Sequence, residues 1–218
     1  MNEKINLKEM ERRAFVSYHR DGLIDLFLGF LLMVSVLSAT LSANGVADSV
    51  RIAIYVPLMV VIGPVLYMVG KRYITIPRLG YVKFGPERRS QRKLMTIILV
   101  HVVLLTLVIW TYTSRKTLGY FGSIMGTYGM SLIIVLIIMA FFSFAVYLTD
   151  YKRLYILGLI VAGIEPLHII AERNFDPKYV GLISSGIPGL ILLVMGGVTL
   201  IQFLHKYEKI DSEVEYGK

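Results

Sequence analysis

The chain has 218 residues, of which 56% are hydrophobic and only 17% are charged, and its mean hydropathy is +0.66. An ordinary soluble domain is about 45–50% apolar and about 25% charged, so this composition excludes a typical water-soluble protein and predicts an integral membrane protein. The formal net charge is +8, and the absence of cysteine excludes disulfides, thiolate metal ligands and a cysteine nucleophile.

The first 20 residues are polar and lack the short apolar core of a secretory signal. Residues 6–20 place Leu7, Met10 and Phe15 at helical spacing, with basic side chains turned away from most of them. We therefore expect residues 1–20 to form a cytoplasmic amphipathic segment. It either lies on the inner membrane surface or packs against its own bundle.

Six segments are apolar and long enough to cross the hydrocarbon core, which needs about 20 residues. They are residues 22–42, 52–70, 94–113, 130–148, 154–171 and 182–204. We expect an all-α integral membrane protein, with a bundle of about six transmembrane helices in a single membrane domain (residues 21–205) and a short cytoplasmic tail (residues 206–218). The fifth segment is the least typical because it contains Glu165 and His168. Without it the chain would have five spans and an outer C-terminus.

The orientation follows from the lysine and arginine residues, which are retained on the cytoplasmic side of a membrane. Most of the 23 basic residues fall in segments that are internal if the N-terminus is internal. The outer connections then carry only Arg51, Arg115, Lys116, Arg173 and Lys178. We expect both termini in the cytoplasm. We also expect a plasma membrane location, in a prokaryotic cell, because cysteine and a targeting segment are both lacking.

The connection between spans two and three, residues 71–93, is the most basic stretch and is expected in the cytoplasm. We call residues 71–93 the basic loop. Its first half alternates around a turn near Gly80, which predicts short extended segments, and Pro86 marks the start of a helix. A lysine or arginine near an anionic membrane surface contributes about 1 kcal/mol, although positive-inside topology requires the same charges. The expected contacts to lipid headgroups are Lys71, Arg72, Arg88, Arg89, Arg92 and Lys93.

Two glycine-rich stretches bear on helix packing. Residues 117–129 combine several glycines with aromatic side chains, which favours an outer loop at the membrane interface or a re-entrant turn. Span six contains Gly186, Gly189, Gly196 and Gly197. Because small residues let neighbouring helices approach closely, we expect this face to serve packing rather than a gating hinge.

Ionisable residues inside the hydrocarbon core are candidates for function, because a charge there costs about 2.5–3.5 kcal/mol on insertion scales. Glu165 lies about 16 Å along its helix from Leu154, near the middle of the membrane, and His168 follows on the same face. With His101 of span three they form our candidate ion or proton site, since carboxyl and imidazole groups exchange protons. The alternative is a structural interhelical hydrogen bond. A metal site is not expected, because the Glu-x-x-His pattern occurs only once.

Asp21 and Asp25, four residues apart at the inner end of span one, form the second candidate site. A helix that runs through both would place them on one face. The expected partners in the basic loop are Arg72, Arg78 and Lys83. This arrangement predicts either a salt-bridged anchor or a cytoplasmic polar site for a headgroup or an ion.

The sequence contains no metalloprotease, nucleophile-elbow or phosphate-loop motif. We therefore expect no catalytic residues, cofactor or metal, and we favour a protein that is not an enzyme. The preferred hypothesis is a small transporter or channel-like protein centred on Glu165 and His168. The alternatives are a non-catalytic partner or anionic-lipid-binding protein that uses residues 71–93, and a lipid-modifying enzyme. The expected partners are the bilayer with its anionic lipids and a second copy or another protein, but not nucleic acid.

Overall fold

The computed structural model describes residues 16–79, 90 and 119–207, with side chains described for residues 16–79, 90, 129 and 131–207. All regular structure in this part of the chain is helical. Five helical stretches are long and apolar enough to cross a membrane: Val16–Ala43, Asp48–Leu79, Ser131–Thr149, Leu154–Asn174 and Pro177–Lys206. The all-α class is confirmed, and the helices indicate a membrane-embedded protein. The predicted span 94–113 lies outside the described residues, as do residues 1–15 and 208–218.

The long stretches consist of shorter elements, in which η denotes a π-helical turn. The first part of the chain contains α2 (Leu23–Ala43), α3 (Asp48–Pro57), η1 (Leu58–Ile62), α4 (Gly63–Gly70), η2 (Lys71–Thr75) and α5 (Ile76–Leu79). The second part contains α7 (Gly119–Thr149), α8 (Leu154–Ala162), α9 (Ile164–Asn174), α10 (Pro177–Gly181), η3 (Leu182–Gly186) and α11 (Ile187–Lys206).

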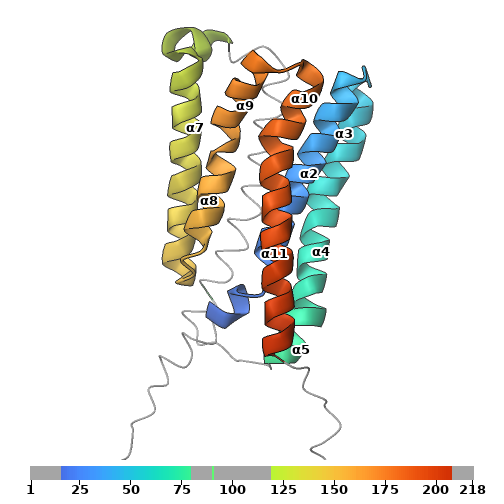
Figure 1. Cartoon of the computed structure of the whole chain (residues 1–218), viewed down its shortest axis with the longest axis vertical. Helices are drawn as coiled ribbons and strands as arrows, with labels where there is room; N and C mark the ends of the chain where they lie inside the picture. The colour runs from blue at the N-terminus through green and yellow to red at the C-terminus, as the bar shows by residue number, and fades with distance from the viewer. Residues whose placement is uncertain (1–15, 80–89, 91–118, 208–218) are drawn as a thin grey trace, which may run out of the picture.

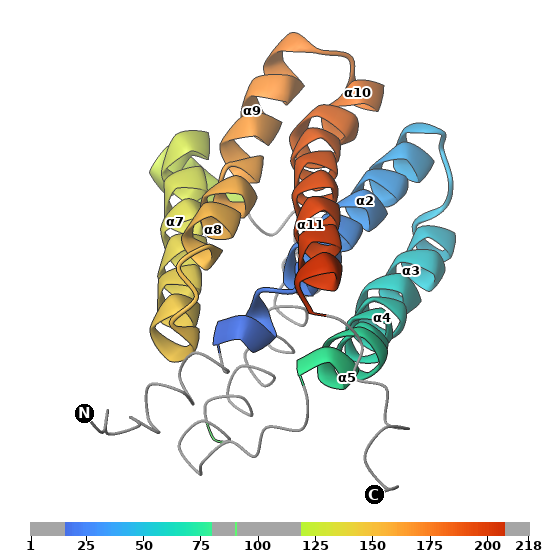
Figure 2. The same ribbon diagram turned by 60° about the horizontal axis from the view of Figure 1, so that its bottom comes forward.

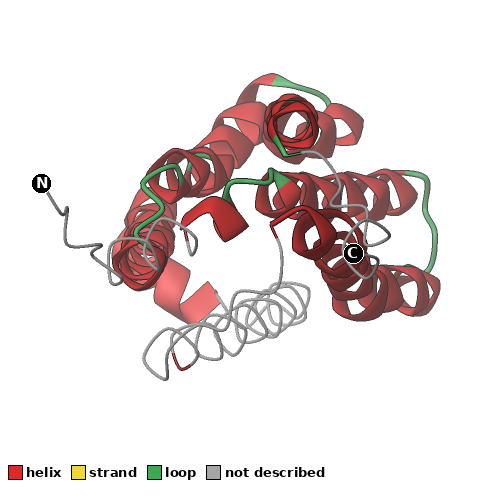
Figure 3. Cartoon of the chain, turned by 90° about the horizontal axis from the view of Figure 1, so that it is seen from below, coloured by secondary structure: helices red, strands yellow, loops and turns green. Residues whose placement is uncertain are grey.

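Helix α2 is central in the described bundle. It packs along α11 and against α4, whereas α7 packs along α8 (Figures 1 and 3). The short helical turn at residues 16–19, α5, the connection between α7 and α8, and the end of α11 all lie at one end of the bundle (Figures 1 and 2). We call this the basic end, because it carries Arg20, Arg72, Arg78, Lys152, Arg153 and Lys206.

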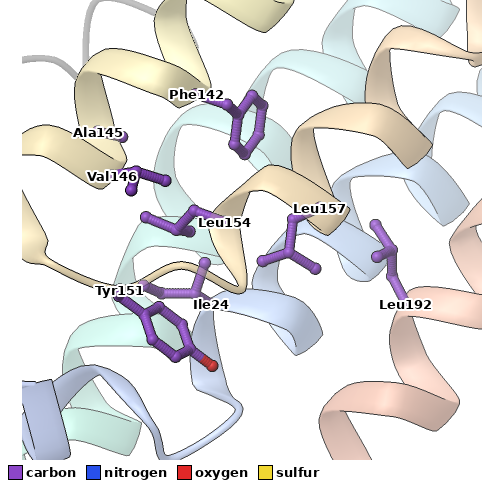
Figure 4. Close-up of a cluster of buried hydrophobic side chains, with 8 residues drawn as sticks. All are labelled: Ile24, Phe142, Ala145, Val146, Tyr151, Leu154, Leu157 and Leu192. Carbon is purple, nitrogen blue, oxygen red and sulfur yellow. The ribbon is translucent and has the colours of Figure 1, made fainter.

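A buried apolar cluster joins α2, α7, α8 and α11. It consists of Ile24, Phe142, Ala145, Val146, Tyr151, Leu154, Leu157 and Leu192 (Figure 4). Because lipid tails are as apolar as leucine, such a cluster stabilises a membrane bundle through close packing rather than through removal from water. The cluster therefore fixes the position of the α7–α8 hairpin against α2.

Glycines on α2 and α11 set the separation of these two helices. A Cβ atom at Gly29 would lie 2.8 Å from Cγ of Leu193, and one at Gly196 would lie 2.8 Å from the backbone nitrogen of Leu26. Real Cβ atoms are not found so close to other heavy atoms. The prediction that the glycines of span six serve packing therefore agrees with the geometry at Gly196, whereas a Cβ at Gly197 would meet nothing within 4 Å.

In the described part of the chain, three π-helical turns each end two residues before a proline. Proline has no N–H, and its ring clashes with the carbonyl four residues back, so an ordinary α-helix is disrupted there. In each turn the residue before the proline donates its N–H to the carbonyl five residues back: Gly63 to Leu58, Ile76 to Lys71 and Ile187 to Leu182. The wider turns allow the helices to continue past their prolines, and such turns are often found at functional sites.

Large apolar side chains remain exposed on the outward faces of the helices. Leu66 and Met68 of α4, Ile137 of α7 and Val194 of α11 are each more than half exposed. Soluble proteins rarely expose extended apolar surfaces of this kind. The described bundle thus has the outer surface expected for contact with lipid tails.

Two predictions about connections are wrong. Residues 71–79, expected to be extended, form η2 and α5, because the wider π-helical turn accommodates Pro77. The stretch from Gly119 to 129, expected to be an outer loop, forms the first part of α7. Glycine disfavours a helix by only about 1 kcal/mol, which is small beside the need to satisfy backbone groups internally near lipid.

Candidate functional site

Asp21 is the centre of a buried polar network at the basic end. Its carboxylate accepts hydrogen bonds from Lys71 Nζ at 2.7 Å and from the hydroxyl of Thr75, and its other oxygen accepts from the backbone N–H of Leu23 at 3.1 Å. Lys71 Nζ also donates to the carbonyl of Tyr18 at 2.5 Å and lies 4.3 Å from the centre of the Tyr18 ring. Both oxygens of the Asp21 side chain therefore have hydrogen-bond partners.

The local backbone explains how Asp21 meets these partners. Helix α2 begins only at Leu23, since Gly22 has a left-handed φ of 78°. Asp21 therefore lies before the helix, where it accepts from the N–H of the first helical residue, Leu23, and it does not share a helical face with Asp25. Any residue larger than glycine at position 22 would bring a Cβ atom 2.5 Å from the carbonyl oxygen of Gly196. Lys71 and Thr75 are the first and last residues of η2.

Asp25 forms a second ion pair with a different part of the chain. Arg153 Nη2, from the connection between α7 and α8, lies 2.5 Å from Asp25 Oδ2. Arg153 also donates to the hydroxyl of Thr199 and, at 3.2 Å, to the carbonyl of Met195 on α11. Unlike Asp21, Asp25 is buried with no hydrogen-bond geometry to a described donor at either carboxylate oxygen.

A cleft opens beside Arg153 at the basic end, with a volume of about 810 Å³. Its lining residues come from residues 16–20, from the connection between α7 and α8, and from the end of α11, which lie at the same end of the bundle (Figures 1 and 2). Its cations are Arg20, Lys152, Arg153 and Lys206, and its other polar lining residues are Ser17, Asp150, Tyr151, Thr199, Gln202 and Tyr207. We call this the basic cleft.

Tyr151 adds a hydrogen-bond donor to the wall of the basic cleft. Burial, reinforced by the negative charge of Asp25, raises the pKa of Tyr151 to about 12. Its hydroxyl therefore stays protonated at physiological pH. The backbone turn before this buried residue includes Asp150, whose φ of 56° is left-handed, a conformation that aspartate adopts more readily than most residues.

The partners of Asp21 and Asp25 differ from those expected from the sequence. Arg72 is exposed, and Arg78 donates to the carbonyl of Ile74. Lys83 lies outside the described residues. The acidic side chains are instead held by Lys71, which was expected to contact headgroups, and by Arg153.

Comparison with protein-family models, with curated proteins and with solved structures finds no match for this chain.

The expected intramembrane site is described only in part. Glu165 is half-buried in the first turn of α9 and has no hydrogen bond or ion pair to another described residue. His168 is exposed, and its Nδ1 lies 3.4 Å from the hydroxyl of Ser184 in η3. His101 lies outside the described residues, as do the expected headgroup contacts Arg88, Arg89, Arg92 and Lys93.

Within the described part of the chain, no group of three or more His, Asp or Glu residues is arranged to hold a metal ion.

The sequence analysis did not identify Thr75, Arg153, Thr199 or Lys206 as site residues. Arg153 could have been noticed as a basic residue next to the apolar start of the fifth span. Thr75 follows Lys71 by four residues, and Thr199 follows Met195, whose carbonyl it contacts, by four residues. Such spacing is common in helices, so it does not mark these threonines as site residues. Tertiary packing places Thr75 beside Asp21, and it places Arg153 beside Asp25 and Thr199.

Proposed function

We propose that this protein is a multi-pass membrane protein that binds an anionic phospholipid headgroup in the basic cleft, at the cytoplasmic face of a prokaryotic plasma membrane. The observation that carries the proposal is the grouping of Arg20, Lys152, Arg153 and Lys206, from three separate parts of the chain, around one cavity of about 810 Å³. Ligand sites usually have volumes of about 300–1,000 Å³. Arginine and lysine are the side chains that recognise phosphate groups.

The charge distribution supports the orientation that this proposal needs. The opposite end of the described bundle carries Arg51, Arg173 and Lys178, fewer basic residues than the basic end. Basic residues are retained in the cytoplasm, where the inner leaflet is rich in anionic lipids. Helix α5 ends at the basic end and α7 begins at the opposite end (Figure 1), which is the arrangement that six spans require.

The basic cleft is a better candidate than the start of the basic loop for contact with headgroups. Lys71 is buried and is already paired with Asp21, so it has no donor to offer a lipid without breaking that pair. Lys152 and Lys206 are exposed and line the cleft. We therefore assign headgroup recognition to the cleft rather than to Lys71.

The test is a binding measurement on the purified protein in uncharged detergent. We expect short-chain phosphatidylglycerol to bind more tightly than short-chain phosphatidylcholine, measured by calorimetry. The double variant K152Q/K206Q removes two cleft cations and should weaken phosphatidylglycerol binding about 30-fold, from about 1 kcal/mol per charge.

The matched control is R88Q/R89Q, which removes the same charge from the basic loop. This variant should retain at least most of the wild-type affinity. Equal binding of the two lipids by the wild-type protein would refute headgroup recognition, and a loss confined to R88Q/R89Q would return the site to the basic loop.

A second candidate function is proton-linked transport centred on Glu165 and His168. It is favoured by one observation: Glu165 is half-buried in a membrane span and has no described partner, and unpaired carboxyl groups at such depth are usually functional. In reconstituted vesicles, E165Q should abolish a pH-dependent flux that the wild-type protein supports. Wild-type vesicles without flux for any ion or small solute tested would count against transport.

We propose no enzymatic activity. The lipid-modifying hypothesis has less support than headgroup binding, because Asp21 and Asp25, the acidic residues that it would use, are engaged in ion pairs in this structure.

A further inference from the structure

Arg153 belongs to two environments at once. Its guanidinium reaches inward to Asp25, Thr199 and the carbonyl of Met195, yet its side chain is 24% exposed and lines the basic cleft. Asp25 beneath it is 1% exposed. An anion that enters the cleft therefore meets a guanidinium whose charge is neutralised from below by a buried carboxylate.

The two acidic residues at the start of α2 differ in how firmly they are held. Asp21 has a hydrogen bond at each oxygen, from Lys71, Thr75 and the backbone of Leu23. Asp25, by contrast, has a single described side-chain partner, the guanidinium of Arg153 at 2.5 Å, and that partner also lines the cleft. The Asp25–Arg153 pair is thus the one that a competing anion can open.

We infer that headgroup binding draws Arg153 from Asp25 and is coupled to the uptake of one proton by the Asp25 carboxylate. A buried carboxylate that loses its cation is strongly destabilised unless it becomes neutral. The proton comes from solvent through the cleft and forms an O–H bond on Asp25, so that the negative charge of the carboxylate beneath the bound headgroup is removed. This inference rests on the proposed headgroup site and assigns its regulation.

The groups around Asp25 allow this exchange. Arg153 and Tyr151 act on it from the connection between α7 and α8, and Asp21 acts on it from the start of α2. Lys71 is committed to Asp21. Helix α11 faces Asp25 with Gly196, where a Cβ atom would lie 3.0 Å from Cβ of Asp25, so α11 presents no ionisable side chain at this contact. The ionisable groups of the cleft itself are Arg20, Asp150, Tyr151, Lys152, Arg153, Lys206 and Tyr207.

Proton linkage makes a quantitative prediction for the wild-type protein. Uptake of one proton on binding tightens the affinity up to tenfold for each unit by which the pH falls. Phosphatidylglycerol is the suitable probe, because its phosphodiester keeps a single negative charge between pH 5 and pH 8. The variant D25N should bind with an affinity that does not depend on pH and matches that of the wild-type protein at acidic pH.

The experiment is calorimetry of short-chain phosphatidylglycerol binding in two cationic buffers of different ionisation enthalpy, imidazole and bis-Tris. The difference between the two measured heats gives the number of protons taken up, which we expect to be about one for the wild-type protein and none for D25N. The matched control H205Q changes an exposed histidine of α11 whose Nδ1 contacts only its own helix, and it should retain the uptake. Difference infrared spectra of the wild-type protein should show a protonated carboxyl band appear on binding.

Each result bears on a separate claim. Binding without proton uptake in the wild-type protein, or uptake that persists in D25N, overturns the inference and leaves the headgroup site standing. Absence of any preference for phosphatidylglycerol at every pH overturns the site and the inference together. If D25N does not fold, the wild-type proton count and the infrared band decide, and absence of either contradicts the inference.

Discussion

The side chains at the start of α2 show how much a polar contact in a membrane bundle depends on its surroundings. Asp21 and Lys71 are both almost completely buried, and each is hydrogen-bonded beyond the pair itself. Removing one partner of such a pair leaves the other charge without compensation, which costs far more than the pair contributes as a whole. The network joins the beginning of α2 to η2, and we expect it to be a main determinant of stability at the basic end.

The variant D21N should lower the stability of the folded protein by about 3–5 kcal/mol, because Lys71 would remain buried without its counterion. The double variant D21N/K71M should recover part of that loss. Thermal unfolding in detergent measures both. The control is D176N, since the pair of Asp176 and Lys178 is exposed at 3.8 Å and such pairs contribute about 0–1 kcal/mol. An equal loss in D21N and D176N would contradict the assignment.

At the level of elements, the contact between α2 and α11 determines where Asp25 lies relative to Arg153 and Thr199. Gly22, just before α2, and Gly29 on α2 face Gly196 and Gly189 on α11 so closely that a Cβ atom at three of these positions would come within 3.0 Å of its neighbours. This approach brings Asp25 beside α11, where Arg153 reaches Thr199. Packing of two glycine faces is therefore a condition for the Asp25–Arg153 pair.

We expect G196A to destabilise the protein by about 1–3 kcal/mol, because its Cβ atom would lie 2.8 Å from the backbone nitrogen and Cγ of Leu26. The neighbouring variant G197A meets nothing within 4 Å and should be neutral or stabilising by up to about 1 kcal/mol, through the better helix propensity of alanine. Thermal unfolding of the two variants side by side measures the difference. Equal midpoints would argue against tight packing at this contact.

For the whole molecule, the distribution of charge between the two ends of the bundle decides on which side of the membrane the basic cleft opens. The orientation is testable because the chain has no cysteine. A single introduced cysteine is therefore the only thiol of the protein that can react with a labelling reagent. In intact cells, Y179C at the end opposite the basic end should react with a membrane-impermeant maleimide. H205C at the basic end should react only after permeabilisation. The reverse pattern would put the basic cleft outside and remove it from the cytoplasmic leaflet.

The sequence by itself determined the class of this protein, since the apolar segments are too long and too continuous for any soluble fold. Each described span contains most of a predicted segment. Helix α2 covers Leu23–Ala43 against a prediction of 22–42, whereas Asp48–Leu79 and Pro177–Lys206 extend beyond the predicted 52–70 and 182–204. The length of each apolar segment could be measured from the sequence alone, because every transmembrane helix needs about 20 apolar residues to cross the hydrocarbon core. The predictions failed at 71–79 and after Gly119, where neither segment is apolar throughout and local patterns favoured turns or extended structure.

The candidate site, by contrast, was decided only by the tertiary structure. Asp21 and Asp25 could be selected from the sequence as charges near an apolar run, but their partners could not, because Lys71 and Arg153 lie 50 and more residues away along the chain. Which cation meets which carboxylate depends on the left-handed turn at Gly22, the π-helical turn before Pro77 and the close approach of α11. Those are properties of how helices pack against each other, and no local periodicity encodes them.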